Sequence, residues 1–134
     1  MTRNLSPTHM LHFEMWVGLR KNRQQLRRTL KRVYNIARPI TQHGGGSGPW
    51  LFIVNRDSAN PKTIRLRKML GVNSKEDVWL ELAFYPNKAE MKKIIRRIWS
   101  QPEFESVAGG LDQLISKRKR GYEATLAYAS LQSV

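Results

Sequence analysis

The sequence predicts a single α+β domain with the element order β-α-β-β-α-β. This is the ferredoxin-like arrangement, in which a four-stranded antiparallel sheet carries two helices on one face. Apolar residues alternate over residues 11–19 and 78–84, as in half-buried strands. They recur at helical spacing over residues 22–41 and 87–100. The two strand-helix segments also align without a gap, so that strand parity, cap, apolar stripe and basic ridge all agree in phase.

Composition places the chain among globular proteins of one domain. It has 134 residues, of which 40% are hydrophobic and 25% charged. The sequence contains no cysteine, which excludes disulfides, thiolate metal sites and thiol nucleophiles and is compatible with a cytoplasmic location. No apolar run is long enough to span a membrane, and no signal-peptide core is present near the start. We expect a flexible leader over residues 1–10 and one domain over residues 11–134.

The first half of the domain reads as strand, helix and strand. Strand 11–19 alternates between apolar positions such as Phe13 and a second set that includes Trp16. A helix follows from the cap Asn22 to about residue 41, where Pro39 and the glycine-rich run after it should end it. The short apolar run at residues 50–54 predicts the second strand.

The second half begins with a stretch, residues 56–77, that has no clear periodicity. Leu66, Met69 and Leu70 could form a short helical turn there or an extended edge segment. Strand 78–84 and helix 87–100 then repeat the first unit. A short helix over residues 111–115 and a final strand over 122–128 complete the domain.

Right-handed crossovers place both helices on the same face of the sheet. We expect the odd positions of the first strand, with Val78 to Phe84 at even positions, to face those helices. The uncovered face then carries Trp16, Trp79, Glu14, Glu81, Tyr85 and Arg20. So much exposed aromatic surface predicts a partner. Most cations lie on the helices behind the sheet, so a second copy of the chain suits this face better than bases stacked as on an RNA-binding sheet.

One stretch of the chain carries a resemblance to known proteins. Tyr85-Pro86-Asn87 follows the third strand, Gln101-Pro102 follows the next helix, and residues 62–77 form a linker before that strand. Over residues 44–104 the chain resembles the dimeric α+β barrel superfamily, nearest to a small bacterial family of unknown function that has Tyr-Pro-Ser and Asp-Pro at these places. The strongly basic charge and the final strand of this chain differ from those of that family. The resemblance implies a homodimer in which two sheets meet around a cavity.

Charge adds a second functional hypothesis. The chain has 24 Lys and Arg against 10 Asp and Glu, a net charge of +14, which favours contact with nucleic acid or another polyanion. The cations form ridges on the two long helices and a cluster near the end of the chain, and we expect the ridges to merge. The candidate polyanion-binding residues are Arg27, Arg28, Lys31, Arg32, Lys92, Lys93, Arg96, Arg97, Lys117, Arg118, Lys119 and Arg120.

Few residues suggest catalysis, so whether the chain is an enzyme stays open. His43 at the end of a helix could act as a base, and Glu14 with Glu81 could do acid-base work in an apolar cavity. Pairing of either glutamate with Arg20 or with a partner's cation is the interpretation that we favour. The glycine run after His43 precedes a strand, which does not fit a phosphate loop. We expect no cofactor and no metal, because the histidines do not form a ligand set.

Overall fold

The computed structural model describes residues 9–54, 59–111, 113–115 and 122–127. Residues 1–8 of the predicted leader 1–10 and the basic cluster Lys117–Arg120 lie outside the described residues, and β1 begins within that predicted leader, at Met10. The elements are β1 (Met10–Leu19), a 3-10 turn (Arg20–Asn22), α1 (Arg23–His43), β2 (Ser47–Ile53), α2 (Pro61–Leu70), β3 (Glu76–Tyr85), α3 (Lys88–Trp99), α4 (Pro102–Gly109) and β4 (Tyr122–Ala127).

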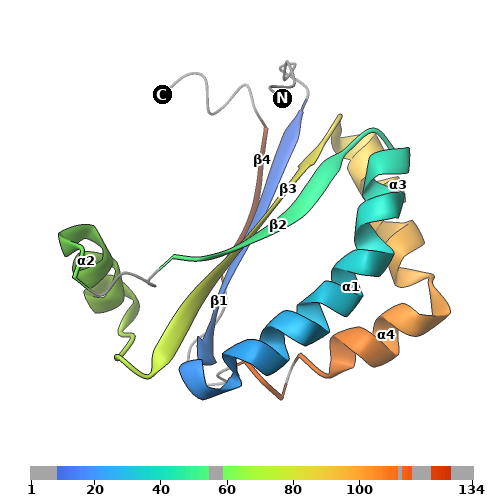
Figure 1. Cartoon of the computed structure of the whole chain (residues 1–134). Coiled ribbons are helices and arrows are strands. Elements are labelled where there is room, and N and C mark those ends of the chain that lie inside the picture. Colours follow the sequence, from blue (N-terminus) through green and yellow to red (C-terminus); the bar gives the residue numbers. More distant parts are fainter. Residues whose placement is uncertain (1–8, 55–58, 112, 116–121, 128–134) are drawn as a thin grey trace.

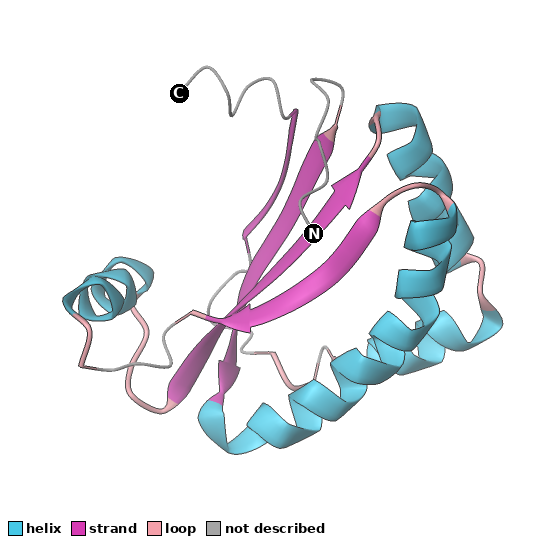
Figure 2. Ribbon diagram, turned by 45° about the horizontal axis from the view of Figure 1, so that its top comes forward, coloured by secondary structure: helices cyan, strands magenta, loops and turns pink. Residues whose placement is uncertain are grey.

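The strands pair antiparallel in the order β2-β3-β1-β4, as Figure 1 shows. Helices α1, α3 and α4 lie on one side of the sheet, and α2 lies on the other side at one end (Figures 1 and 2). The predicted α+β class and the antiparallel sheet are therefore confirmed. The predicted number of helices was too small, because the structure has α2 and α4 in addition to the two helices that the repeat indicated.

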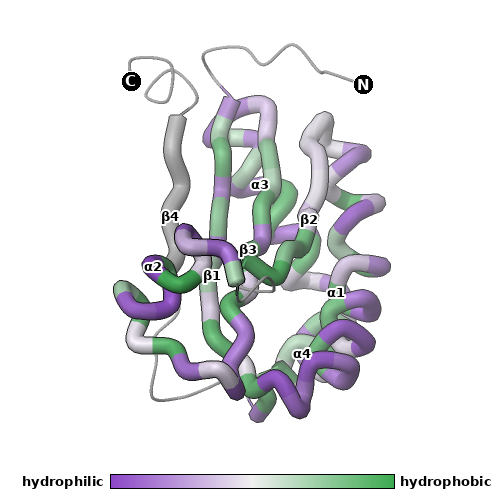
Figure 3. The backbone as a smooth tube through the Cα atoms, turned by 60° about the vertical axis from the view of Figure 1, so that its left-hand side comes forward, coloured by the Kyte–Doolittle hydropathy of each residue, from purple (hydrophilic) through white to green (hydrophobic). Residues whose placement is uncertain are grey.

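Helix α1 follows its apolar stripe closely. Leu26, Leu30, Val33 and Ala37 are buried, while the basic residues on the opposite side are exposed, and Figure 3 shows α1 largely hydrophilic. Pro39 does not end the helix as predicted. It lies exposed within α1, and the helix continues past it to His43. Thr41 beyond it is buried, and its Oγ1 donates to the Ala37 carbonyl at 2.8 Å.

Two helices besides the repeated pair carry local signals. Of the two alternatives for residues 56–77, the helical one is present as α2, which begins after Asn60, whose side chain accepts from the Lys62 amide at 2.9 Å, and ends before Gly71, which has a φ of 62°. Helix α4 was not expected, and it begins with Pro102, a residue that suits the first turn of a helix. The short helix expected at 111–115 is instead a turn region that reaches β1 through a bridge from Ile115 to Gly18.

The face of the sheet that the helices cover is the opposite of the predicted one. Trp16 and Trp79 are buried within the chain, with Trp79 0% exposed, and pack in one core with Leu26 and Ile98. Their rings stack at 5.3 Å between centroids. The prediction that these tryptophans lie between two subunits was therefore wrong. Alternation fixes which residues share a face, but large aromatic rings lie among the carboxylates of the less apolar face, and only the packing of the helices decides which face they cover.

Candidate functional site

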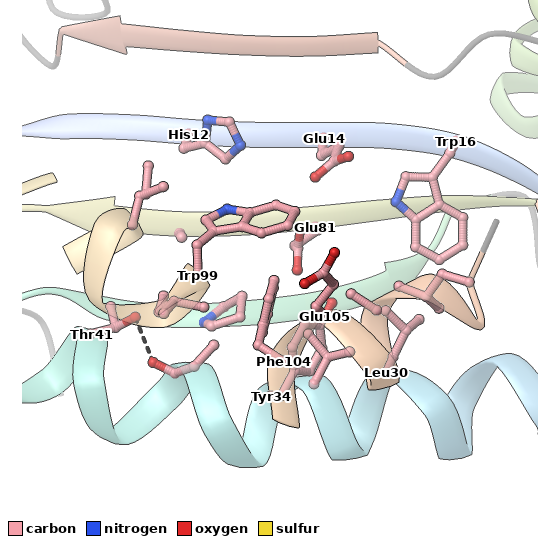
Figure 4. Close-up of a pocket in the computed structure, with 18 of the residues that line it drawn as sticks. His12, Glu14, Trp16, Leu30, Tyr34, Thr41, Glu81, Trp99, Phe104 and Glu105 are labelled. Atoms are coloured by element: carbon pink, nitrogen blue, oxygen red, sulfur yellow. Dashed lines mark hydrogen bonds between the residues drawn. The ribbon is translucent and has the colours of Figure 1, made fainter. Parts of the chain in front are cut away.

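A cavity of about 590 Å³ lies between the sheet and helices α1, α3 and α4 (Figure 4). It lies within one chain, open on one side, on the face of the sheet that was expected to be uncovered. Its walls come from β1, β2, β3, the three helices and the turn after α4. They consist of His12, Glu14, Trp16, Leu30, Val33, Tyr34, Ala37, Thr41, Pro49, Glu81, Ala83, Tyr85, Ile95, Ile98, Trp99, Phe104, Glu105, Ala108, Gly109, Leu111 and Ile115. The volume and the apolar lining are typical of small-molecule sites.

Acidic side chains enter this cavity from the sheet and from α4. Glu14 of β1 and Glu81 of β3 are direct partners in the strand register, so their side chains lie on the same face. Glu105 adds a third carboxylate from α4, and Figure 4 shows all three pointing into the cavity. His12 lies one pleat further along β1. The register of the sheet also pairs Glu14 with Glu123 of β4.

Lysine and arginine are absent from the described lining of the cavity, which does include His12. The cation that approaches it is Arg38, whose guanidinium carbon lies 5.1 Å from the centre of the Tyr34 ring. Arg38 Nε also donates to the Pro49 carbonyl oxygen at 3.0 Å. Arg38 is exposed, so it borders the wall that Tyr34 forms rather than entering the cavity.

Two tyrosines show the electrostatic character of the cavity. Burial, and then the negative charge of Glu81, raises the pKa of Tyr34 far above its ordinary range. No hydrogen bond of acceptable geometry joins that carboxylate to the buried Tyr34 hydroxyl, which has no partner. Burial, followed by the charge of Glu81, raises the pKa of Tyr85 to about 12. Both hydroxyls therefore stay protonated at neutral pH and can serve as hydrogen-bond donors.

Aromatic rings at the open side of the cavity come from α3 and α4. Trp99 is 61% exposed and meets Phe104 edge-to-face, with 4.8 Å between the ring centres. Sequence reasoning did not assign Trp99, Phe104, Glu105 or Tyr34 to a site. Tyr34 was visible as part of the apolar stripe of α1. Phe104 and Glu105 were missed together with α4, and recognising Pro102 as a first-turn residue would have been the signal for both.

The residues that the sequence singled out have separate places in the structure. Glu14, Glu81, Trp16 and Tyr85 line the cavity, and Trp79 lies in the core beside Trp16. Arg20 does not belong to this set. Its Nε lies 3.3 Å from Asp77 Oδ1, at the end of the sheet where Arg23 binds the same carboxylate, so the ion pair described for Arg20 is not with Glu14 or Glu81.

His43 is likewise distant from the cavity lining. It is exposed at the last residue of α1 and is not among the described residues that line the cavity. Among the residues that the structure describes, no three His, Asp or Glu side chains are grouped so that they could hold a metal ion. No helix within the described ranges is both long enough and apolar enough to cross a membrane.

The basic ridges are exposed but lie on different stretches of helical surface. All eight ridge residues on α1 and α3 are exposed. Helix α3 packs near the C-terminal end of α1, where Ile94 comes close to Gly44. The α1 ridge lies in the other half of that helix, beside α4 (Figure 1). The expected merging of the two ridges is therefore not the arrangement seen.

Comparison with known proteins places the chain by fold. No family model matches it, and no curated protein matches its sequence. An uncharacterized NIPSNAP-like domain protein of Burkholderia xenovorans is similar, with a TM-score of 0.62 and 10% identity over 90% of this chain and 85% of that one. A variant of SnoaB, a cofactor-independent oxygenase of Streptomyces nogalater, has a TM-score of 0.52 and 12% identity over 89% and 91%. The chain thus shares its α+β fold with these proteins, in agreement with the ferredoxin-like arrangement that the sequence predicts.

Proposed function

We propose that the chain binds a small, mainly apolar molecule in the cavity between its sheet and its helices. The observation that carries this proposal is the 590 Å³ cavity itself, which is walled by aromatic and aliphatic side chains from β1, β3, α1, α3 and α4. A cavity of this size can bury most of the surface of a drug-sized molecule. Donors such as the Tyr34 hydroxyl would orient such a molecule among the apolar walls. The oxygenase activity of SnoaB is a property of that protein, and fold alone does not transfer it.

Binding of the neutral dye N-phenyl-1-naphthylamine, followed by its fluorescence, tests this proposal. The wild-type protein should take up one dye per chain. Ala108→Phe places a ring on the cavity wall and should weaken uptake at least roughly tenfold, because it removes volume that the dye needs. Ser106→Phe adds the same ring to the exposed side of α4 and is the matched control. Equal uptake by the two variants would mean that the dye binds elsewhere.

We further propose that the chain forms a homodimer through the sheet face that α1, α3 and α4 leave uncovered. This face carries Phe13 and Leu82, which are direct partners in the register of β1 and β3, and Phe52 and Trp50 of β2, which are 50% and 39% exposed. Its described centre is apolar and carries no charged side chain. A second copy therefore suits it better than a charged partner does, because a self-complementary apolar patch can pair with itself.

Light scattering at micromolar concentration tests the dimer. The wild-type chain should have twice the monomer mass, and Phe52→Glu should reduce it to that of a monomer by burying a charge in the interface. Met69→Glu changes an exposed residue of α2 and serves as the control. A wild-type monomer, or a Phe52→Glu dimer, would contradict this arrangement.

A second candidate function is sequence-independent binding of a polyanion. The observation in its favour is the exposure of Arg27, Arg28, Lys31 and Arg32 on one side of α1. Binding of a labelled single-stranded oligonucleotide should then fall steeply between 50 and 200 mM salt, by roughly tenfold or more, because each phosphate contact releases a counterion. Reversal of the α1 charges should abolish it, whereas unchanged affinity would exclude this surface.

A further inference from the structure

The charge of the cavity opposes the charge of the protein. The chain carries +14 overall, yet three of its 10 acidic residues line this cavity, and none of its 24 lysines and arginines is among the described lining residues. An anionic ligand would meet three carboxylates here, although the rest of the surface would attract it. A cationic ligand would be repelled by the surface in general and attracted by the cavity. The local distribution of charge therefore selects the sign of the ligand.

The two glutamates of the sheet are held together by the fold. Glu14 and Glu81 are direct cross-strand partners, and like charges in that position destabilise a sheet. Both side chains are only partly exposed and lie between a sheet and three helices, so water screens their repulsion less than it would on an open surface. The two carboxylates therefore bring negative charge to the wall of the cavity, where it acts on whatever enters.

We propose that the ligand of this cavity is an apolar molecule that carries one organic cationic group, such as a protonated amine or a quaternary ammonium. The inference rests on the proposed function, since it describes the ligand of the same cavity. The cationic group would lie at Glu14 and Glu81, with Glu105 on its third side. The apolar body would contact Trp16 and the rings of Trp99 and Phe104, which also favour a nearby cation through their faces.

The Tyr34 hydroxyl supplies an independent sign that a polar group belongs here. It is buried on the wall of the cavity and has no hydrogen-bond partner in the structure. Buried polar groups are nearly always satisfied, so an unpaired hydroxyl at a cavity wall points to a partner supplied by a ligand. The oxygen can accept a hydrogen bond from an ammonium and donate one to a neighbouring carboxylate. A metal ion fits less well, because no three described His, Asp or Glu side chains are grouped to bind one.

Three naphthalene compounds of matched size test the sign of the charge. They are 2-naphthylmethylamine, which is a cation, 2-naphthylmethanol, which is neutral, and 2-naphthoate, which is an anion. Each is titrated against bound N-phenyl-1-naphthylamine, and its affinity is measured by displacement of that neutral dye. The amine should bind roughly tenfold more tightly than the alcohol, and the naphthoate most weakly, as expected for a cation among carboxylates and aromatic rings.

Variants identify the residues that set this preference. Glu14→Gln with Glu81→Gln should retain the dye but bring the affinities of amine and alcohol close together. Glu105→Gln changes an exposed cavity residue and should lower the preference without depending on the folding of the double variant. Glu103→Gln on the same helix lies outside the described cavity lining and should leave the preference unchanged.

The outcomes separate the inference from the proposed function. Dye binding with equal affinities for amine and alcohol, or with the naphthoate binding most tightly, would overturn the cationic ligand and leave the cavity as a binding site. A preference for the amine that survives in both glutamine variants would also overturn it. Failure of the wild-type protein to bind the dye or any of the three compounds would overturn the proposed function itself.

Discussion

Asp77 holds the start of α1 against the sheet through a buried ion pair. Its side chain is 0% exposed, and Arg23 binds it with two hydrogen bonds, from Nε to Oδ2 at 2.7 Å and from Nη2 to Oδ1 at 2.6 Å. Arg20 Nε adds a longer contact at 3.3 Å. Arg23 is the first residue of α1, where the helix dipole disfavours a cation, so the carboxylate also offsets that unfavourable placement.

The two partners should differ in how much their loss destabilises the fold. Arg23→Ala leaves a fully buried carboxylate with only the longer contact from Arg20, and we expect it to lower the free energy of unfolding by about 3–5 kcal/mol. Asp77→Asn leaves Arg23 with 24% of its side chain exposed, so water can rehydrate part of the released charge. We therefore expect a smaller cost for Asp77→Asn, about 2–3 kcal/mol.

The pH dependence follows from the pKa of Asp77. Burial by itself raises this pKa, but the hydrogen bonds and charges of Arg23 and Arg20 outweigh it, so the pKa lies below its usual value. An unfolded aspartate has a pKa of about 3.9. The ion pair should therefore contribute fully above that pH and should lose its contribution as the pH falls through the lower, folded value. The stability difference between wild type and Asp77→Asn should be constant near neutrality and should shrink below about pH 4.

Urea unfolding followed by circular dichroism, at neutral pH and at stepwise lower pH, measures these quantities. Each variant should shift the midpoint with little change of slope. A cost for Arg23→Ala smaller than that for Asp77→Asn would refute the reasoning from burial. A stability difference that grows on acidification would refute the assigned direction of the pKa shift.

Three further experiments test the fold. Leu26→Ala should lower the free energy of unfolding by about 3–5 kcal/mol because the residue is fully buried, whereas Arg27→Ala next to it should stay within about 0.5 kcal/mol; equal costs in urea unfolding would contradict the facing of α1. Gly48→Ala should cost about 1–3 kcal/mol, since Gly48 has a φ of 97° and a Cβ there would lie 2.9 Å from the Leu82 carbonyl oxygen, and an unchanged thermal midpoint would argue against this backbone geometry. Asn87→Ala should cost about 1 kcal/mol through loss of the cap to the Glu90 amide, and a neutral result by the same measurement would mean that the cap does not form in solution.

The sequence by itself determined the class of the domain and the course of its repeated units. Residues 11–19 alternate and become β1, the stripe from Leu26 to Ala37 becomes the buried side of α1, and Asn87 caps α3 as expected. These features depend on near neighbours in the chain, because period two, period 3.6 and a capping side chain are all local. The sequence also singled out Glu14, Glu81 and Trp16, which the structure brings together in the cavity.

The tertiary structure decided which side of the sheet those residues face. One alternating set of β1 and β3 is almost wholly apolar, whereas the other mixes Trp16 and Trp79 with carboxylates, so alternation favoured the wrong side as the one that binds the helices. The stacked rings of Trp16 and Trp79 are buried and pack in one core with Leu26 and Ile98. Once that side was chosen, Glu14 and Glu81 had to enter the covered layer with them, because register places them on the same face. The acidic cavity is therefore a consequence of long-range packing, which alternation and composition could not specify.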